Sequence, residues 1–244
     1  MPELPEVEIM TRALRRKLQG ERISRLEIND PKIRLRGSPV GRRIVRVSRR
    51  AKYIILSLDD GRHLLVHLRM TGWFEFRAPA RYRFALRTRR TTAYFADSRR
   101  FGQVELLNEQ QLHAALAKLG PEPFADEFDP ARLRCTRRPI KTALLDQRLV
   151  AGVGNIYASE SLWRARIHPL RPAQRLSDRQ LRAVHRGLVA AMRQALRYGP
   201  RIYEVQTFAV YDRAGHPCRR CRQPIRRVVQ QQRSTFYCPR CQKP

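Results

Sequence analysis

Residues 140–160 read IKTALLDQRLVAGVGNIYASE, and this stretch decides how the second half of the chain folds. Apolar residues recur at helical spacing on both sides of a short segment that contains two glycines. Glycine adopts turn conformations without steric cost, so the pattern predicts two helices, within 140–150 and 151–163, separated by a turn at the glycines. Asn155 follows this turn at a helix N-terminus, where backbone N–H groups attract anions.

The sequence downstream of this turn indicates one long helix. Ser177 and Gln180 fit a capping box, in which the two side chains satisfy backbone N–H groups at the helix start. Apolar residues then recur at helical spacing as far as Leu196, and Gly199-Pro200 ends the pattern. We therefore expect a helical domain over residues 131–211.

The C-terminal segment carries two C-x2-C pairs, CRRC at 218–221 and CPRC at 238–241. Four thiolates at this spacing suit one tetrahedral Zn²⁺ on a β-hairpin, and a metal with four cysteine ligands has no open position for catalysis. Disulfides are the alternative, but they are rare in cytosolic proteins. The sequence thus predicts a zinc finger over 212–244 with one structural ion. Its ligands are Cys218, Cys221, Cys238 and Cys241. A fifth cysteine, Cys135, is expected to be a small packed hydrophobe.

The first half is predicted to be rich in β-strands behind one leading helix. Residues 5–19 have helical spacing, with a proline suited to the first turn. Alternating stretches follow, and Asp59-Asp60-Gly61 between two of them is typical of a hairpin turn. The expected strands lie within 22–28, 42–48, 52–58, 62–68, 82–87, 92–97 and 103–107. This pattern predicts an N-terminal β-sandwich or barrel.

A short helix over 108–119 closes the first half, and PEPFADEFDP at 121–130 follows it. This segment is rich in proline and acid, as linkers are. The chain is therefore predicted to be an α+β protein with a β-domain over 1–120, a linker over 121–130, the helical domain and the zinc finger.

The composition points to a polyanionic partner. The chain has 51 Lys and Arg against 21 Asp and Glu, a formal net charge of +30, and such a surplus is typical of nucleic-acid binding. Ribosomal-type RNA binding and an arginine-rich genome are the alternative explanations. No apolar run approaches the roughly 18 residues of a membrane span, and the acidic N-terminus does not resemble a signal peptide. We expect a cytoplasmic protein without a membrane partner.

Seven segments, in order along the whole chain, resemble the formamidopyrimidine-DNA glycosylase (Fpg)/endonuclease VIII family. They are PELPEVE (2–8), RRAKYIIL (49–56), HLRMTG (67–72), DSRRFG (97–102), LGPEPF (119–124), IKTALLDQRLVAGVGNIYASE (140–160) and QQQRSTFYCPRCQ (230–242). PELPE and RRFG favour the purine-lesion branch. The resemblance makes the helical domain a helix-two-turn-helix DNA-binding domain. It implies a monomeric, bacterial, nucleoid-associated DNA glycosylase and AP lyase of base excision repair, acting on oxidised purines or abasic sites in duplex DNA.

The resemblance also assigns catalytic roles. Pro2, freed by removal of the initiator methionine, would be the nucleophile that forms a Schiff base and supports β,δ-elimination. Glu3 would shuttle a proton, and Glu6 would support the amine or cap the first helical turn. Lys52 would act electrostatically or as a proton donor near the lesion. Arg233, in the zinc loop, would hold a phosphate and take part in the second elimination.

Further positions match the family's DNA contacts. Met70 and Phe101 would be apolar wedges in the gap left by the flipped base, although by composition alone such residues lie more often in a core. Arg99 would hydrogen-bond the orphaned partner base. The positions that match phosphate contacts are His67, Lys141 and Asn155.

Two departures from the family pattern bear on the choice of base. The segment 197–215 leaves little room for the glycine-rich loop that covers the flipped base, and the family's Lys-His-Asp segment reads Ala80-Arg81-Tyr82. An endonuclease VIII-like preference for oxidised pyrimidines, or mainly AP lyase activity, therefore stays open. A non-catalytic damaged-DNA-binding protein and an RNA-associated zinc-ribbon protein are the alternatives from other classes.

Overall fold

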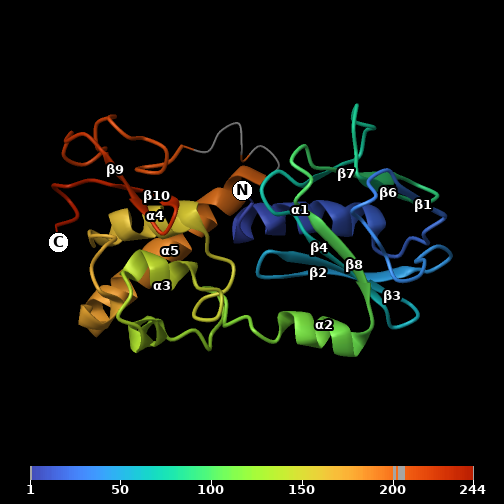
Figure 1. Ribbon diagram of the computed structural model, residues 1–244, viewed down its shortest axis with the longest axis horizontal. Coiled ribbons are helices and arrows are strands. Elements are labelled where there is room, and N and C mark those ends of the chain that lie inside the picture. The colour runs from blue at the N-terminus through green and yellow to red at the C-terminus, as the bar shows by residue number, and fades with distance from the viewer. Residues whose placement is uncertain (1, 200–201, 203–206, 244) are drawn as a thin grey trace. The chain divides into compact units, whose positions relative to one another are not determined.

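A computed structural model describes residues 2–199, 202 and 207–243, and the chain divides into two compact units, Met1–Lys118 and Leu119–Pro244. The first unit contains helices α1 and α2 and two β-sheets, whereas the second contains the remaining helices and one β-hairpin (Figure 1). The predicted α+β class is confirmed. The finer division at 121–130 and 212 stays a prediction.

Helix α1 (Leu4–Leu18) leads the first unit as predicted, with bounds one residue earlier. Its start is set by Pro5 in the first turn and by a capping box between the residues at positions 3 and 6. The buried face includes Val7, Met10 and Leu14, which belong to the main core of this unit. The apolar periodicity of the sequence therefore places the helix against the sheets.

Two four-stranded antiparallel sheets form the β-sandwich, with strand orders β1-β6-β7-β5 and β2-β3-β4-β8. Their strands are β1 (Arg25–Ile28), β2 (Ile44–Arg50), β3 (Tyr53–Leu58), β4 (His63–His67), β5 (Trp73–Glu75), β6 (Phe84–Arg87), β7 (Thr92–Ala96) and β8 (Gln103–Leu107). The hairpin at 59–61 joins β3 to β4 as expected. The sequence did not indicate β5, because three residues are too short to show alternation. Apolar side chains from both sheets share one core with α1.

The chain passes between the two sheets three times, from β1 to β2, from β4 to β5 and from β7 to β8, and the last two passages are neighbours. The first crossover, residues 68–72, leads from β4 to β5, and the second crossover, residues 97–102, leads from β7 to β8. β4 pairs with β8, with His67 opposite Gln103, and β5 pairs with β7, with Trp73 opposite Ala96. Each crossover therefore starts and ends beside the other. Helix α2 (Glu109–Leu116) then ends the unit, with Asn108 as its N-cap.

The second unit is built around the packing of α4 (Asn155–Ala165) on α5 (Asp178–Tyr198). The capping box of Ser177 and Gln180 is present, which confirms the predicted start of the long helix. The other elements are the 3₁₀ helices η1 (Pro130–Cys135) and η2 (Ala173–Arg175), helix α3 (Ile140–Leu145), and the hairpin strands β9 (Arg226–Gln230) and β10 (Arg233–Tyr237).

Two details of the second unit differ from the prediction. Helix α3 ends at Leu145 rather than at residue 150, because Asp146 caps it and the Gln147 side chain donates to the carbonyls of Leu145 and Val153. These side-chain bonds compete with the helix and hold residues 146–154 as a turn. Cys135 is exposed at the end of η1, so its expected burial was wrong. Among the helices that the structure describes, none is long and apolar enough to cross a bilayer.

Candidate active site and metal centre

The first unit buries two carboxylates at the N-terminus of α1. Glu3 and Glu6 are each only 1% exposed, and the backbone N–H of Glu3 donates to Glu6 Oε2 at 2.8 Å. The Glu3 side chain accepts in turn from the backbone N–H of Glu6. Glu6 thus has the capping position that we expected, and the positive end of the helix dipole favours both charges. Pro2 is buried next to this pair, and Met1 lies outside the described residues.

Lys52 lies in a two-residue turn between β2 and β3, directly before the strand that it was expected to open. Ala51, its partner in the turn, has a φ of 50°, a left-handed conformation that costs an alanine roughly 1–2 kcal/mol. Arg49 donates from Nη1 to the Ala51 carbonyl and from Nε to Glu8 on α1, each at 2.9 Å. This arginine therefore connects the turn of Lys52 to helix α1.

His67, at the end of β4, has a defined tautomer. The backbone N–H of Arg69 donates to its Nδ1 at 3.0 Å, so Nδ1 is the acceptor and the neutral ring carries its proton on Nε2. Burial, together with the positive charges of Arg69 and Lys52, lowers the pKa of His67 to about 3. The ring therefore stays neutral at physiological pH, with Nε2–H as a donor of the kind that a phosphate requires.

The two predicted wedge residues, Met70 and Phe101, lie on the two crossovers together with Arg99. Met70 on the first crossover is 39% exposed and Phe101 on the second is 50% exposed, so neither is a core residue. The guanidinium of Arg99 lies 5.0 Å from the centre of the Phe101 ring, and the Arg99 backbone N–H donates to the Thr71 hydroxyl at 3.3 Å. The exposed side chains of the two crossovers thus form one patch with apolar and cationic character.

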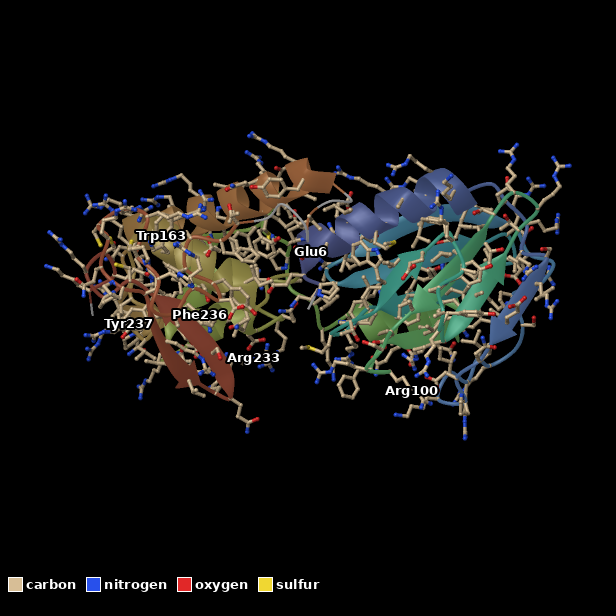
Figure 2. The ribbon with its side chains drawn as sticks, turned by 90° about the horizontal axis from the view of Figure 1, so that it is seen from above. Glu6, Arg100, Trp163, Arg233, Phe236 and Tyr237 are labelled. Carbon is tan, nitrogen blue, oxygen red and sulfur yellow. The ribbon has the colours of Figure 1, made fainter. Side chains whose placement is uncertain are left out.

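The second unit brings Lys141, Asn155 and the zinc hairpin together. Lys141 is 1% exposed and donates from Nζ to the Ser234 carbonyl at 2.9 Å and to Thr235 Oγ1 at 2.6 Å. Asn155 at the start of α4 donates from Nδ2 to the same Ser234 carbonyl. Arg233 precedes Ser234, is exposed, and begins β10 after the hairpin turn (Figure 2). The two residues of the helical region thus hold the strand that presents Arg233.

The four cysteines of the C-terminal pairs form a compact cluster. Their Sγ atoms all lie within 4.8 Å of one another, which fits four Zn–S bonds of about 2.3 Å around one ion. Burial alone would raise the pKa of Cys218, but hydrogen bonds from Trp163 and from the backbone N–H groups of Arg220 and Cys221 lower it to about 6. Burial raises the pKa of Cys241 to about 12. A divalent metal deprotonates all the thiols that it binds, so this donor set fits zinc.

The zinc finger is attached to helix α4 through Trp163. Its Nε1 donates to Cys218 Sγ at 3.5 Å, and the guanidinium carbon of Arg220 lies 3.8 Å from the centre of its ring. Arg220 Nη1 also donates to the Trp163 carbonyl at 2.6 Å. The metal ligands and the helical region therefore share one packed contact, labelled at Trp163 in Figure 2.

The sequence did not single out several buried polar residues. Glu160, within the stretch quoted first, is 4% exposed and accepts from the backbone N–H groups of Ala209, Val210 and Tyr211. It anchors the chain just before the zinc finger. The signal that the sequence offered for Glu160 was an acidic residue on an otherwise apolar helix face.

The predicted short segment 197–215 falls partly on residues 200–201 and 203–206, which lie outside the described residues.

Three family models match the chain in order. The formamidopyrimidine-DNA glycosylase N-terminal domain matches residues 1–104, its H2TH domain matches residues 119–207, and a zinc finger found in FPG and IleRS matches residues 215–244. The formamidopyrimidine-DNA glycosylase of Chloroflexus aurantiacus is 44% identical over an alignment of 274 positions, gaps included, covering 99% of this chain and 98% of the relative. That of Thermus thermophilus is 39% identical over an alignment of 264 positions, with the same coverage.

Solved structures have the same fold. The crystal structure of MutM (Fpg) from Thermus thermophilus has a TM-score of 0.89 at 38% identity, covering 99% of this chain and 98% of that one. Lactococcus lactis Fpg non-covalently bound to DNA containing an AP site has a TM-score of 0.91 at 32% identity, covering 99% and 100%. The complex of that protein with DNA containing FAPY-dG has a TM-score of 0.90 at 31% identity, with the same coverage.

Proposed function

The chain belongs to the formamidopyrimidine-DNA glycosylase family, and we infer from this membership that it is a DNA glycosylase and AP lyase. Its substrates are oxidised purines such as 8-oxoguanine and formamidopyrimidine in duplex DNA. The observation that carries this inference is the 44% identity with a formamidopyrimidine-DNA glycosylase over almost the full length of both chains. One structural zinc ion belongs to the protein, held by the four clustered cysteines.

We propose Pro2 as the nucleophile. Once Met1 is removed, the Pro2 nitrogen is a secondary amine, and α-amino groups have pKa values near 8, so a neutral fraction exists at physiological pH. This nitrogen attacks C1′ of the damaged nucleotide, the bond from C1′ to the base breaks, and the base leaves with a proton. The C1′–O4′ bond then breaks as O4′ takes up a proton, which opens the sugar ring and leaves an iminium between Pro2 and C1′. The iminium acidifies the C2′ proton, whose loss expels the 3′ phosphate; a second elimination expels the 5′ phosphate, and water then releases Pro2.

The acids beside Pro2 have roles that their burial supports. Glu3 transfers a proton to the departing base or the sugar ring oxygen, because a carboxyl group adjacent to the nucleophile lies within reach of both. Glu6 keeps Glu3 and the start of α1 in place through the capping box. Lys52 adds a positive charge near the lesion, and Arg233 holds a phosphate and assists the second elimination.

The remaining site residues bind and distort the duplex. Met70 and Phe101 fill the gap left by the flipped nucleotide, Arg99 pairs with the orphaned base, and His67 donates from Nε2–H to a phosphate. Lys141 and Asn155 belong to the second unit's phosphate-binding region, where they hold the strand that follows Arg233. A net charge of +30 supplies the non-specific attraction to the duplex.

The range of damaged bases is proposed to be broader than in the longer relatives. Alignments with them run over 264 to 287 residues, whereas this chain has 244, so the relatives contain segments that this chain lacks. If one of them is the cover over the flipped base, oxidised pyrimidines will also be accepted, because the pocket walls select the base. We further propose that the protein acts as a monomer on the nucleoid in the bacterial cytoplasm.

The decisive experiment is a nicking assay on matched duplexes, each run with and without borohydride. The panel holds 8-oxoguanine, formamidopyrimidine, thymine glycol, dihydrouracil and an abasic site, at one salt concentration because a chain this basic binds any DNA at low ionic strength. We expect cleavage of the purine lesions, cleavage of thymine glycol and dihydrouracil as well if the range is broader, and a borohydride-trapped covalent complex. Mass spectrometry of the purified protein should show that Met1 is absent.

Variants of two prolines test the assignment of the nucleophile. Pro2→Gly should abolish the trapped complex or slow its formation strongly, whereas Pro31→Gly, at an exposed turn in the same unit, should leave it unchanged. Trapping at the wild-type rate in Pro2→Gly would exclude Pro2 as the nucleophile. Tight DNA binding with no cleavage of any duplex by the wild-type protein would favour a non-catalytic damaged-DNA-binding protein.

A further inference from the structure

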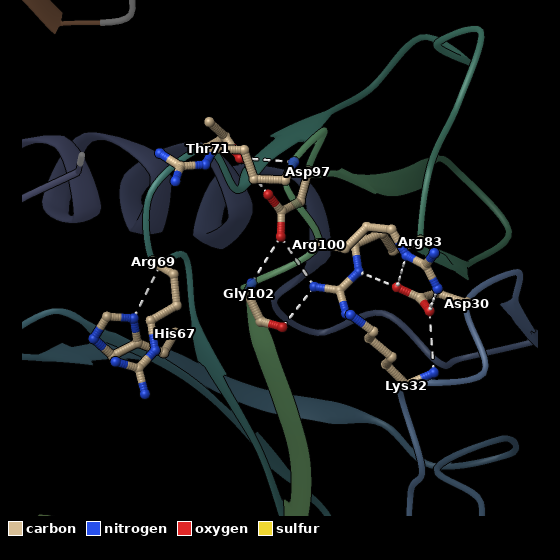
Figure 3. A network of polar contacts seen from close by, with 10 residues as sticks. Asp30, Lys32, His67, Arg69, Thr71, Arg83, Asp97, Arg100 and Gly102 are labelled. Carbon is tan, nitrogen blue, oxygen red and sulfur yellow. Dashed lines mark hydrogen bonds and ion pairs between the residues drawn. The ribbon is translucent and has the colours of Figure 1, made fainter.

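The two crossovers that carry the wedge residues are joined by one buried carboxylate. The Asp97 side chain is fully buried, its Oδ1 accepts from the Thr71 hydroxyl on the first crossover, and its Oδ2 accepts from the Gly102 backbone N–H at 2.7 Å on the second (Figure 3). A carboxylate that accepts several hydrogen bonds in a buried site is strongly fixed in position. Asp97 therefore holds the start and end of the second crossover to the middle of the first.

Arg83 balances the charge of Asp97 and extends the network. Its Nη1 donates to Asp97 Oδ2 at 3.0 Å and to the Gly102 carbonyl at 2.5 Å, and its Nε donates to Asp30 Oδ2 at 2.6 Å. Asp30 also binds Arg100 of the second crossover, and this bond, with others from Lys32 and Arg83, keeps the pKa of Asp30 well below its usual range. Buried charges are tolerated only when they are paired, so these contacts favour a single arrangement.

One aromatic ring, that of Phe95, packs against the backbone of both crossovers. A Cβ atom at Gly72 would lie 2.8 Å from Phe95 Cζ, and a Cβ atom at Gly102 would lie 2.5 Å from the same atom. Neither glycine has a positive φ, so close approach, not backbone conformation, excludes a side chain at both positions. At Gly102 the nearest group is the Phe95 ring, whereas at Gly72 the Leu68 carbonyl oxygen, 2.4 Å from the added Cβ, is nearer still than the ring. The backbones of both crossovers thus rest on Phe95, a fully buried core residue.

The exposed side chains of the two crossovers therefore project from a backbone that is held in one arrangement. Met70 and Phe101 present apolar surface to solvent, while the residues that follow them in sequence, Thr71 and Gly102, are bound to Asp97. Groups held in their functional arrangement before binding lose less conformational entropy when they engage a partner. A fixed wedge can therefore replace base stacking at a lower cost than a mobile one.

We propose that Asp97 is a positioning residue for opening the duplex, which sets the arrangement of Met70, Arg99 and Phe101 without contacting DNA. This inference rests on the proposed function, since it assigns the two crossovers to the base-flipping step. Its specific consequence is that Asp97 matters most where a stacked, paired base must be displaced. It matters little where the base is already unstacked, because flipping such a base costs less.

The test compares two substrates that differ only in pairing. One is a duplex with 8-oxoguanine opposite cytosine, and the other contains the same lesion within a three-base mismatched bubble. Single-turnover base release is measured for the wild type and for Asp97→Asn, whose amide cannot accept from Gly102 and Arg83 as the carboxylate does. We expect Asp97→Asn to slow release from the paired duplex about tenfold or more relative to the bubble, as expected when charged hydrogen bonds are lost.

Matched variants separate positioning from general destabilisation. Asp59→Asn, at an exposed hairpin turn, makes the same chemical change and should leave the ratio of the two rates at the wild-type value. Thr71→Val removes the hydroxyl that donates to Asp97 and accepts from the Arg99 backbone N–H, but leaves the other contacts of Asp97 in place. It should shift the ratio in the same direction by less, and Thr71→Ser should restore it. If thermal unfolding shows that Asp97→Asn does not fold, the ratio of the two release rates measured for Thr71→Val tests the positioning role instead.

The outcomes distinguish the two levels of inference. Equal loss on the paired duplex and the bubble, or no loss on either, would overturn the positioning role of Asp97. Borohydride trapping of an abasic-site duplex by the wild type tests the proposed function independently, because an abasic site has no base to displace. Failure of that trapping would overturn the glycosylase and lyase assignment instead.

Discussion

Lys141 and Asn155 donate hydrogen bonds to the same backbone oxygen, that of Ser234, and each donor lies 2.9 Å from it. Lys141 lies in α3 and Asn155 is the first residue of α4, so the two helices that flank the turn at 146–154 both bind a single strand of the zinc hairpin. The neighbouring residue in that strand is Arg233. The contact supplies hydrogen-bond acceptors to the ammonium group of a lysine that is only 1% exposed.

Lys141→Met should therefore impair the positioning of Arg233. The change leaves the Ser234 carbonyl and Thr235 Oγ1 each short of one donor in a buried site, which costs about 1–3 kcal/mol. We expect lower stability in urea and a shift of the cleavage products from β,δ-elimination toward β-elimination alone, the same product shift that we expect for Arg233→Ala. Lys118→Met removes the same charge at an exposed position and should keep the wild-type products. An unchanged product pattern in Lys141→Met would contradict the link.

Removal of zinc should be detectable at Trp163. A chelator releases the four thiols, so the hydrogen bond from Trp163 Nε1 to Cys218 and the stacking of Arg220 on the ring are lost. In a Trp73→Phe background, Trp163 is the remaining tryptophan. We expect its fluorescence to shift to the red on chelation and to return when zinc is added back, in parallel with strand cleavage. A spectrum that does not respond while cleavage is lost would show that the finger does not act through α4.

Stability should depend on pH through His67. Its pKa is about 3 in the folded chain and near 6.5 when unfolded, so between these values the unfolded state binds more protons than the folded state. The free energy of unfolding should therefore fall as the pH drops from 6.5 toward 3. His67→Gln should remove this part of the dependence, measured by urea unfolding at several pH values. Identical slopes for both proteins below pH 6 would show that the ring is accessible to protons.

Gly102→Ala should disrupt the second crossover. The new Cβ would overlap Phe95, and overpacking of this kind typically costs about 1–3 kcal/mol. Phe95→Leu in the same chain should recover part of the loss, because it removes the ring atoms that the methyl group meets. Thermal unfolding of the two single variants and the double variant gives the coupling energy. Strictly additive effects would mean that Gly102 and Phe95 do not meet.

Local signals were enough to predict much of this fold. Caps at Ser177, a hairpin turn at 59–61 and two cysteine pairs act over short distances, so their geometry can be read from neighbouring residues. The helix over 140–150 was too long because Asp146 and Gln147 bind the backbone of the turn, and such competition depends on side-chain contacts. The three-residue strand β5 gives no periodicity at all.

The support of the candidate site could not be predicted because it is non-local. The two crossovers are adjacent only because β4 pairs with β8 and β5 with β7, and Asp97 has its role only after that pairing. The family resemblance named Met70 and Phe101, but it said nothing about what holds them. The burial of Lys141 likewise depends on a strand more than ninety residues further along the chain.

The position of the two crossovers also sets the order in which function is gained and lost. Each crossover joins one sheet to the other, so neither is complete until both sheets have paired across long sequence separations, a late event in folding. A partly opened chain keeps its full charge of +30 and still adheres to phosphates. Gentle warming should therefore first produce molecules that bind DNA but cannot flip a base out of the duplex. Such inactive molecules compete with active ones for the same damaged strand.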